Sequence, residues 1–214
     1  MKQVSALIVA ILLSILPGHS ASAAKMKRIL VFGDSLSEGF TLRQSEAYPM
    51  LLVAKLRAAG LDYEVSNISQ SGGTTETGLE RLGPRLKRKI DIFILELGLN
   101  DAFRGTPVTE IRANLQEILD RVKRANPQVR FVICGMQLPN YSADDYINVF
   151  GKMYVDLAAK NNAALVPYLL EGVSGDPLLN LPDRLHPNAA GHKILAENVW
   201  RVLEPIAKEV SAIK

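Results

Sequence analysis

Cysteine, metal-binding motifs and an excess of charge are what this sequence lacks. Its 214 residues include a single cysteine, Cys134, so the chain cannot form an internal disulfide. It has no H-E-x-x-H motif, no paired cysteines and no P-loop, so we expect neither a metal nor another cofactor. The formal net charge of +3 is too balanced to indicate nucleic acid as a partner. The apolar residues directly before Cys134 predict a buried strand and a thiol that packs in the core.

The N-terminus carries an apolar run, Val4–Leu16, that is too short to span a bilayer comfortably, which takes roughly 20 residues. Lys2 precedes this run, and Ala21-Ser22-Ala23 follows it with the small residues of a cleavage site. We therefore predict a signal peptide over residues 1–23 and a mature domain over residues 24–214 that is periplasmic or secreted. After cleavage no stable membrane anchor would remain. A retained anchor is the alternative.

Strand-like apolar runs alternate along the mature chain with longer segments of helical period, without repeats, low-complexity tracts or linkers. This alternation predicts βαβ units, hence one α/β domain whose parallel sheet has helices on both faces. The strand-like runs are residues 28–32, 63–68, 90–97, 129–134 and 163–166. The helical segments are residues 47–59, 75–87, 108–125, 143–160 and 189–210.

A group of cations ends the second helical segment and comprises Arg81, Arg85, Lys87, Arg88 and Lys89. The helix dipole favours cations at a helix C-terminus, so we expect a solvated helix end. Contact with anionic lipid headgroups at a membrane surface is the alternative.

The apolar run Ile29–Phe32 stops abruptly at Gly33-Asp34-Ser35. A buried strand that ends in a glycine turn brings the next side chain to the rim of the sheet, where ligands bind in open α/β folds. Ser35 is therefore placed where a nucleophilic hydroxyl would be useful. Glycine, aspartate and serine are also common turn formers, so an ordinary strand-to-loop turn is the alternative.

Histidine is scarce as well, which leaves few candidates for an imidazole base. His192 falls within the last helical segment beside Lys193, and we expect it at the surface. His186 lies in the loop before that helix, with Asp183 three positions upstream. This spacing lets the carboxylate bind one ring nitrogen while the other faces outward, as triad catalysis requires. A local Asp–His hydrogen bond at the entry to the helix is the alternative.

Two further polar loops, residues 69–74 and 98–101, follow the second and third strand-like runs. Both should emerge at the same sheet edge as Ser35. A glycine lets a backbone N–H approach a ligand closely, and Asn100 offers an amide donor. Donors that converge near a nucleophile are what an oxyanion hole requires.

Together these blocks resemble the SGNH hydrolases, also called GDSL esterases and lipases. The matching residues, in chain order, are Gly33-Asp34-Ser35-Leu36-Ser37, Gly72, Gly98-x-Asn100-Asp101 and Asp183-x-x-His186. The resemblance spans nearly the whole mature chain. It implies a flavodoxin-like three-layer α/β/α sandwich with a five-stranded parallel sheet in the order 2-1-3-4-5.

The same resemblance implies a Ser-His-Asp triad in which Ser35 is the nucleophile, His186 the general base and Asp183 the residue that orients the base. The oxyanion hole would consist of the backbone N–H groups of Ser35 and Gly72 and the side-chain amide of Asn100. Two positions depart from the family pattern. Gly73 replaces the usual aspartate, and Leu99 stands where related sequences often have glycine, a change that we expect to alter loop mobility and substrate fit.

Within the family, the export signal, the length and the segment Leu95–Arg104 are most similar to the bacterial periplasmic thioesterase/lysophospholipase/arylesterase group. This similarity implies a serine esterase that hydrolyses small or lipid-like acyl esters and thioesters through an acyl-enzyme at Ser35, and we expect a monomer. A glycan or peptidoglycan O-acetyl esterase and a non-catalytic periplasmic lipid or glycan binder are the alternatives.

Apolar residues near the polar loops are candidates to line an acyl groove, with ordinary packing as the alternative. They are Leu36, Phe40, Leu99, Leu138, Pro139, Tyr141, Leu181 and Pro182.

Overall fold

A computed structural model describes residues 26–138 and 145–213 of the chain. At its centre is a five-stranded parallel sheet with the order β2-β1-β3-β4-β5, which confirms the predicted fold class and strand order. The strands are β1 (Lys27–Gly33), β2 (Tyr63–Asn67), β3 (Ile92–Glu96), β4 (Arg130–Cys134) and β5 (Ala164–Val166). The signal peptide predicted over residues 1–23 lies outside the described residues.

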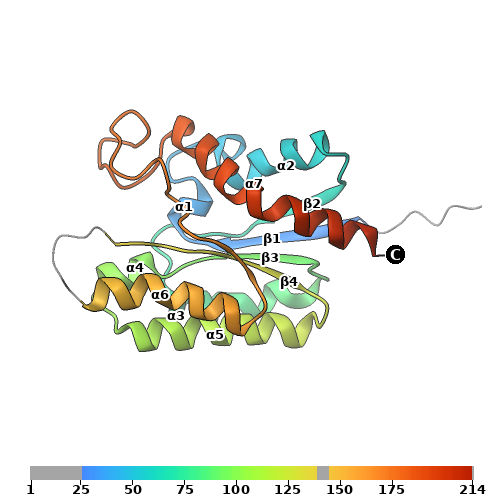
Figure 1. Cartoon of the computed structure of the whole chain (residues 1–214), viewed down its shortest axis with the longest axis horizontal. Helices are drawn as coiled ribbons and strands as arrows, with labels where there is room; N and C mark the ends of the chain where they lie inside the picture. The colour runs from blue at the N-terminus through green and yellow to red at the C-terminus, as the bar shows by residue number, and fades with distance from the viewer. Residues whose placement is uncertain (1–25, 139–144, 214) are drawn as a thin grey trace, which may run out of the picture.

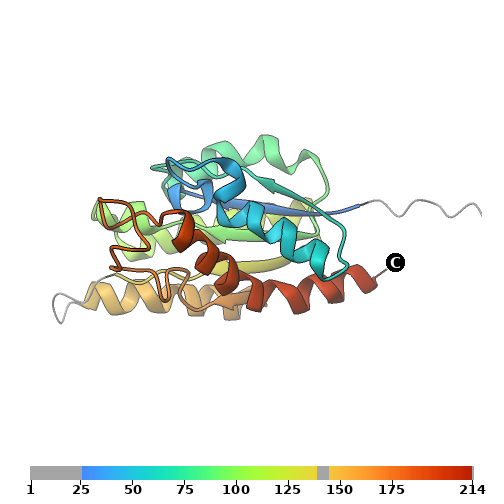
Figure 2. The ribbon, with the colours of Figure 1, turned by 90° about the horizontal axis from the view of Figure 1, so that it is seen from above.

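Helices cover both faces of the sheet and complete the three layers (Figure 1). One face carries α2 (Tyr48–Ala58) and α7 (Ala189–Ala212), which lie side by side in both ribbon views (Figure 2). The opposite face carries α3 (Thr75–Leu82), α5 (Val108–Ala125) and α6 (Asp145–Lys160). Four short helices lie in the connecting segments: α1 (Ser35–Glu38), α4 (Leu99–Phe103) and the 3₁₀ helices η1 (Gln44–Glu46) and η2 (Gly83–Lys87).

The core forms where the sheet is covered on both sides. The apolar residues of β1, Ile29–Phe32, have no exposed surface because this strand pairs with β2 and β3 and has helices above and below it. On α5 the apolar side chains recur on one face, and that face is the buried one. Its buried residues include Ile111, Leu115, Ile118, Leu119 and Val122. Cys134 is buried in β4, as predicted.

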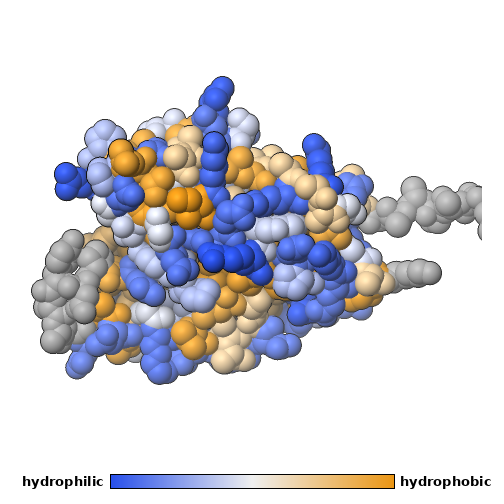
Figure 3. Space-filling model, turned by 45° about the horizontal axis from the view of Figure 1, so that its top comes forward, coloured by the Kyte–Doolittle hydropathy of each residue, from blue (hydrophilic) through white to orange (hydrophobic). Residues whose placement is uncertain are grey.

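The surface shows the complementary pattern. On the side that α2 and α7 cover, hydrophilic side chains are interspersed with smaller apolar patches (Figure 3). Over the described part of the chain, no helix combines the length and the apolar character needed to cross a membrane.

Two expectations about the segment after β2 need correction. The predicted helix 75–87 ends at Leu82, because Pro84 cannot continue the backbone ladder and the chain goes on as a 3₁₀ turn. Arg81 is not part of a solvated helix end. Its guanidinium donates to the carbonyl oxygens of Ile68 and Gly33 and lies 4.0 Å from the ring centre of Phe32. The strand ends therefore hold Arg81 against the sheet.

Candidate active site

The polar loops meet at the carboxyl ends of the strands, where α1 and α4 begin (Figure 1). Ser35 is the first residue of α1 and follows β1 after Asp34 alone. The carboxylate of Asp34 accepts a hydrogen bond from the N–H of Leu36 at 3.0 Å and so caps this short helix. Ser35 is therefore fixed at the rim of the sheet, with 8% of its surface exposed.

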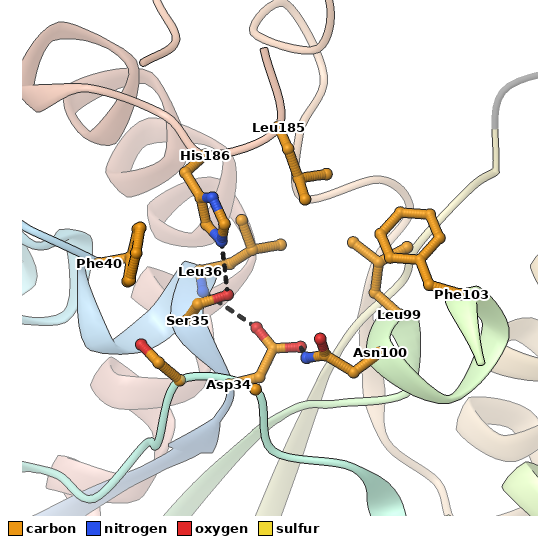
Figure 4. Close-up of a pocket in the computed structure, with 11 residues that line it drawn as sticks. Asp34, Ser35, Leu36, Phe40, Leu99, Asn100, Phe103, Leu185 and His186 are labelled. Carbon is orange, nitrogen blue, oxygen red and sulfur yellow. Dashed lines mark hydrogen bonds between the residues drawn. The ribbon is translucent and has the colours of Figure 1, made fainter. Parts of the chain in front are cut away.

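Ser35, His186 and Asp183 form a continuous hydrogen-bonded series, although Ser35 is distant in sequence from the other two. The distance from Ser35 Oγ to His186 Nε2 is 3.0 Å, and the distance from His186 Nδ1 to Asp183 Oδ2 is 2.8 Å. Figure 4 shows the hydroxyl of Ser35 between the imidazole on one side and Asp34 and Asn100 on the other. The arrangement has the order that activation of a serine by an oriented imidazole needs.

The turn that carries His186 is organised by Asp183. Besides the imidazole, its carboxylate accepts the backbone N–H groups of His186 at 3.0 Å and Leu185 at 2.9 Å. These hydrogen bonds, the one from the His186 backbone first, lower the pKa of Asp183 to about 2. The carboxylate is thus ionised at neutral pH. The turn is closed by the hydrogen bond from the N–H of Leu181 to the carbonyl oxygen of His186 at 2.7 Å.

Backbone N–H donors are also present at this site. The N–H groups of Ser35 and Gly72 donate to no other described residue, and both residues line the same hollow. Gly72 has a φ of +72°, which only glycine adopts without strain. By contrast, the N–H of Gly73 is used within its own turn, where it donates to Gln70. Gly72 is therefore the glycine whose N–H is available to a ligand.

The amide of Asn100 has partners in this structure. Its Nδ2 donates to Asp34 Oδ2 at 3.0 Å and to the carbonyl oxygen of Gly73 at 3.1 Å. Asn100 belongs to α4, which is held to α3 because the Asp101 carboxylate accepts both the N–H and the hydroxyl of Thr75. The amide therefore points toward the hydroxyl-bearing turn, and both of its hydrogens are engaged.

His192 corrects the expectation of a surface residue, because only 1% of it is exposed. Its Nδ1 accepts the backbone N–H of Tyr48 at 3.1 Å, and its ring stacks on that of Tyr48. Burial, and secondarily the nearby His186, lower the pKa of His192 to about 4. The ring is neutral at physiological pH and joins α7 to the start of α2.

A hollow of about 160 Å³ opens over Ser35, and apolar side chains form part of its walls beside the polar groups of the site. Of the predicted groove residues, Leu36, Phe40 and Leu99 line it. Leu138 lines a separate hollow beside α6, and Leu181 and Pro182 lie outside the lining of the hollow over Ser35. Pro139 and Tyr141 fall outside the described residues.

Three lining residues, Ser71, Phe103 and Leu185, were not singled out from the sequence. Phe103 and Leu185 are 54% and 37% exposed although both are apolar. Each stands close to a motif, Phe103 after Asn100 and Leu185 before His186, and that proximity was the signal available in the sequence. Among the described residues, no group of three or more His, Cys, Asp or Glu side chains is placed to hold a metal ion.

Comparison with known proteins places this geometry in context. The model of the GDSL-like lipase/acylhydrolase family matches residues 31–194. Esterase TesA of Pseudomonas aeruginosa is 36% identical over 184 residues, which are 86% of this chain and 90% of that protein. The Escherichia coli protein named thioesterase 1/protease 1/lysophospholipase L1 is 33% identical over 190 residues, 88% of this chain and 89% of that one.

Solved structures that resemble this chain lead to the same family. The crystal structure of TesA superposes with a TM-score of 0.79 at 36% identity and covers 84% of this chain and 99% of that one. The esterase EstA from Pseudoalteromonas, in a structure inhibited by monoethylphosphonate, gives a TM-score of 0.77 at 28% identity, with 84% and 97% covered. The chain belongs to the GDSL-like lipase/acylhydrolase family and is a serine esterase.

Proposed function

We propose that Ser35 attacks the carbonyl carbon of an acyl ester or thioester, with His186 as general base and Asp183 as the residue that orients the imidazole. The observation that carries this proposal is the hydrogen-bonded series from Asp183 through His186 to Ser35. Because the Asp183 carboxylate is ionised, it accepts a proton-bearing Nδ1. The lone pair of Nε2 then faces the hydroxyl of Ser35.

The reaction has two halves. The proton of Ser35 Oγ passes to His186 Nε2 as the bond between Oγ and the carbonyl carbon forms. The bond to the alcohol or thiol then breaks, and the imidazolium donates its proton to the leaving oxygen or sulfur. A water molecule that gives its proton to His186 next attacks the acyl-Ser35 ester, and the carboxylic acid departs as Ser35 regains a proton.

The oxyanion that forms in each half would be stabilised by the N–H groups of Ser35 and Gly72, which have no partner among the described residues. Asn100 joins them by releasing its hydrogen bond to the neutral carbonyl of Gly73. Its hydrogen bond to the Asp34 carboxylate stays, because a bond to an ionised acceptor is stronger. The donor set is therefore completed only when the substrate is bound.

The walls of the hollow suggest how a substrate lies. Leu99 and Phe103 stand on the opposite side of Ser35 from Phe40 (Figure 4), so an acyl chain would extend over the exposed ring of Phe103. A second hollow of about 370 Å³ shares Phe40 and Ser71 with the first and is lined mostly by polar residues. Those residues are Glu38, Thr41, Gln44, Asn67, Ser69 and Ser71. The alcohol or thiol part of the substrate would leave on this side.

We infer acyl chains longer than acetyl, because an apolar wall gains binding energy with each buried methylene, about 0.8 kcal/mol per group. The relatives named esterase TesA, arylesterase and thioesterase/lysophospholipase support an ester and thioester hydrolase of broad acyl specificity. An enzyme specific for acetyl groups on glycans would gain nothing from such a wall.

The test is hydrolysis of p-nitrophenyl and acyl-CoA esters of graded chain length by the wild type, Ser35→Ala and His186→Ala. We expect kcat/KM of the wild type to rise from acetyl to medium chains on both series, and both variants to lose nearly all turnover. A sharp maximum at acetyl would instead favour the glycan esterase. Turnover of Ser35→Ala at the wild-type rate would show that the nucleophile lies elsewhere.

The cellular location of the enzyme is a separate proposal. We infer that residues 1–23 are a signal peptide and that the mature enzyme is a monomer that is periplasmic or secreted. The basic, apolar and small-residue order of this segment supports export. Expression of the full chain in a Gram-negative host, followed by intact-mass analysis of the periplasmic and external fractions, should give a chain that begins at Ala24. A full-length chain confined to the membrane fraction would contradict this expectation.

A further inference from the structure

Glu96 is a buried carboxyl group that the reaction above does not use. It is the last residue of β3 and has no exposed surface. Its Oε2 accepts the backbone N–H of Asp34 at 3.1 Å and the hydroxyl of Ser37 at 2.7 Å. These two donors flank Ser35 in the sequence. A single oxygen atom therefore holds the turn that carries the nucleophile on both sides.

The turn fits closely around this carboxyl group. A Cβ atom on Gly33 would lie 2.4 Å from Glu96 Oε2 and 2.5 Å from Ser37 Oγ, so any larger residue would push the carboxyl away. Since Ser37 Oγ donates to Glu96, the contact of 2.7 Å between Ser37 and Tyr48 must have the Tyr48 hydroxyl as donor. The buried side therefore presents a directed chain of hydrogen bonds that ends on Glu96.

The surroundings of the other oxygen of Glu96, Oε1, indicate that this carboxyl group is protonated. Oε1 is buried and accepts no hydrogen bond from any described residue, which would be costly for an ionised carboxylate. Burial, and then the neighbouring charge of Asp34, raise the pKa of Glu96 well above its usual range. Other titratable side chains whose charge interacts with it are Asp34, Tyr48, Arg81, Cys134 and Tyr154.

Asp34 is the natural acceptor of that proton. Burial raises the pKa of Asp34 to about 6, but the N–H of Leu36, a hydrogen bond from Glu96 and the amide of Asn100 favour its ionised form. Of two interacting carboxyl groups, the one with the lower pKa ionises first and the other stays neutral, and burial raises the pKa of Glu96 further than that of Asp34. Glu96 therefore donates, and Asp34 accepts.

We propose that Glu96 is a positioning residue: its neutral carboxyl holds the turn of Ser35 through Oε2 and donates from Oε1 to Asp34, which in turn holds the amide of Asn100. Glu96 touches neither substrate nor the reacting atoms. It acts through Asp34 and Ser37, and it fixes the nucleophile and one oxyanion donor relative to each other.

Two substitutions separate this proposal from a merely structural role. Glu96→Gln keeps an accepting oxygen and a donating group, so we expect kcat within about fivefold of the wild type. Glu96→Met has similar length but no polar atom, and loss of positioning by such a change costs up to ~10²-fold in kcat. KM should change less than kcat in both. Ser37→Ala, which removes one of the two donors to Oε2, serves if Glu96→Met does not fold, and we expect its kcat to fall by about three- to tenfold.

A spectroscopic measurement tests the proton directly and does not depend on turnover, so it stays informative even if the proposed esterase chemistry fails. At pH 7 the infrared spectrum of the wild type should contain the C=O stretch of a protonated carboxylic acid. Glu96→Gln should abolish this band, and Glu117→Gln, which alters an exposed ion-paired carboxylate on α5, should keep it. Absence of the band in the wild type, or a loss of kcat in Glu96→Gln as large as in Glu96→Met, would overturn the proposal.

Discussion

Two histidines that lie close together in the sequence have opposite environments. His186 sits in a turn ahead of α7 with one ring nitrogen on Asp183 and the other on Ser35. His192 lies within the first turns of α7, is buried, and accepts a backbone N–H from α2. Both imidazoles are held firmly. They differ in two respects: whether a hydrogen-bonded neighbour can transfer a proton to the ring, and whether a substrate can reach the ring.

This difference indicates that the surroundings, rather than the residue type, decide the role of a histidine here. The backbone N–H that holds the ring of His192 is neither an acid nor a base near neutral pH, and burial keeps that ring neutral. A carboxylate and a hydroxyl give His186 a path for a proton from Ser35 to the imidazole. The predictions that follow would break or sharpen the comparison, and they run from the largest expected effect to the smallest.

The largest expected effect distinguishes the roles of His186 and His192 in catalysis. His186→Ala removes the proposed general base, so kcat/KM should fall by roughly 10³–10⁶-fold, as for members of other catalytic triads. His192→Gln keeps an acceptor for the N–H of Tyr48 and should stay within about fivefold of the wild type. Steady-state hydrolysis of p-nitrophenyl esters measures both. Equal losses in the two variants would show that the contrast between the rings has no functional meaning.

The next effect concerns the partner that only His186 has. Asp183→Asn disturbs the tautomer and orientation of the ring but leaves the base in place, so we expect a loss of roughly 10²–10⁴-fold, smaller than that of His186→Ala. The same assay measures it, with unfolding monitored by circular dichroism as the control. A loss greater than that of His186→Ala would contradict the orienting role.

Asn100 tests the donors on the other side of Ser35. Removal of one oxyanion donor typically costs about 10²–10³-fold in kcat, and Asn100→Ala should fall in this range with a smaller change in KM. The split between kcat and KM is the diagnostic measurement. A variant in which only KM rises would indicate that Asn100 binds the ground state of the substrate.

His192 should matter for stability in acid. Its pKa is about 4 in the folded state and about 6.5 in the unfolded chain, so the unfolded state binds more protons between these values. Stability should therefore fall as the pH falls from 6.5 to 4, by at most about 3 kcal/mol. Urea unfolding at several pH values across this range gives the free energy of unfolding as a function of pH. That free energy should change less with pH in His192→Gln than in the wild type, and as much as in the wild type in Ser35→Ala. An identical pH dependence in His192→Gln would mean that other groups cause the acid sensitivity.

The smallest effect concerns Phe40, whose aromatic ring packs against the imidazole of His186. The ring centre of Phe40 lies 4.5 Å from that of His186. Aromatic ring pairs at such distances typically contribute about 0.5–1.5 kcal/mol of stabilisation. Phe40→Ala should lower kcat by about two- to tenfold on short esters. Phe103→Ala is the matched control, because Phe103 lines the same hollow across from Ser35 and should raise KM for long acyl chains only. Identical behaviour of the two variants would argue against a role of Phe40 in holding the imidazole.

The sequence predicted the elements that rest on local patterns. The buried run before Ser35 and the amphipathic face of α5 follow from hydrophobic periodicity, whereas the sheet order was implied by the resemblance to the SGNH hydrolases. Positions set by tertiary contacts were missed. His192 looks exposed beside Lys193, yet the approach of α2 buries it, and Arg81 looks like a helix-end cation until the carbonyls at the strand ends are placed near it.

Glu96 is an intermediate case. A glutamate between Leu95 and Leu97, in a strand buried on both faces, is a visible irregularity in the pattern. The sequence marks the position as unusual. It does not reveal that the turn of Ser35 supplies the two donors, because that depends on the pairing of β1 with β3.

A fluorophosphonate reagent tests the central claim most directly, because it reacts with a serine only when that serine is activated. Peptide mapping by mass spectrometry should find a single adduct, on Ser35, in the wild type. His192→Gln should form the same adduct at a similar rate, whereas in His186→Ala labelling should be slowed by orders of magnitude. An adduct on another residue such as Ser37 or Ser71, or fast labelling of His186→Ala, would contradict the assignment of Ser35 and His186 as the reacting pair.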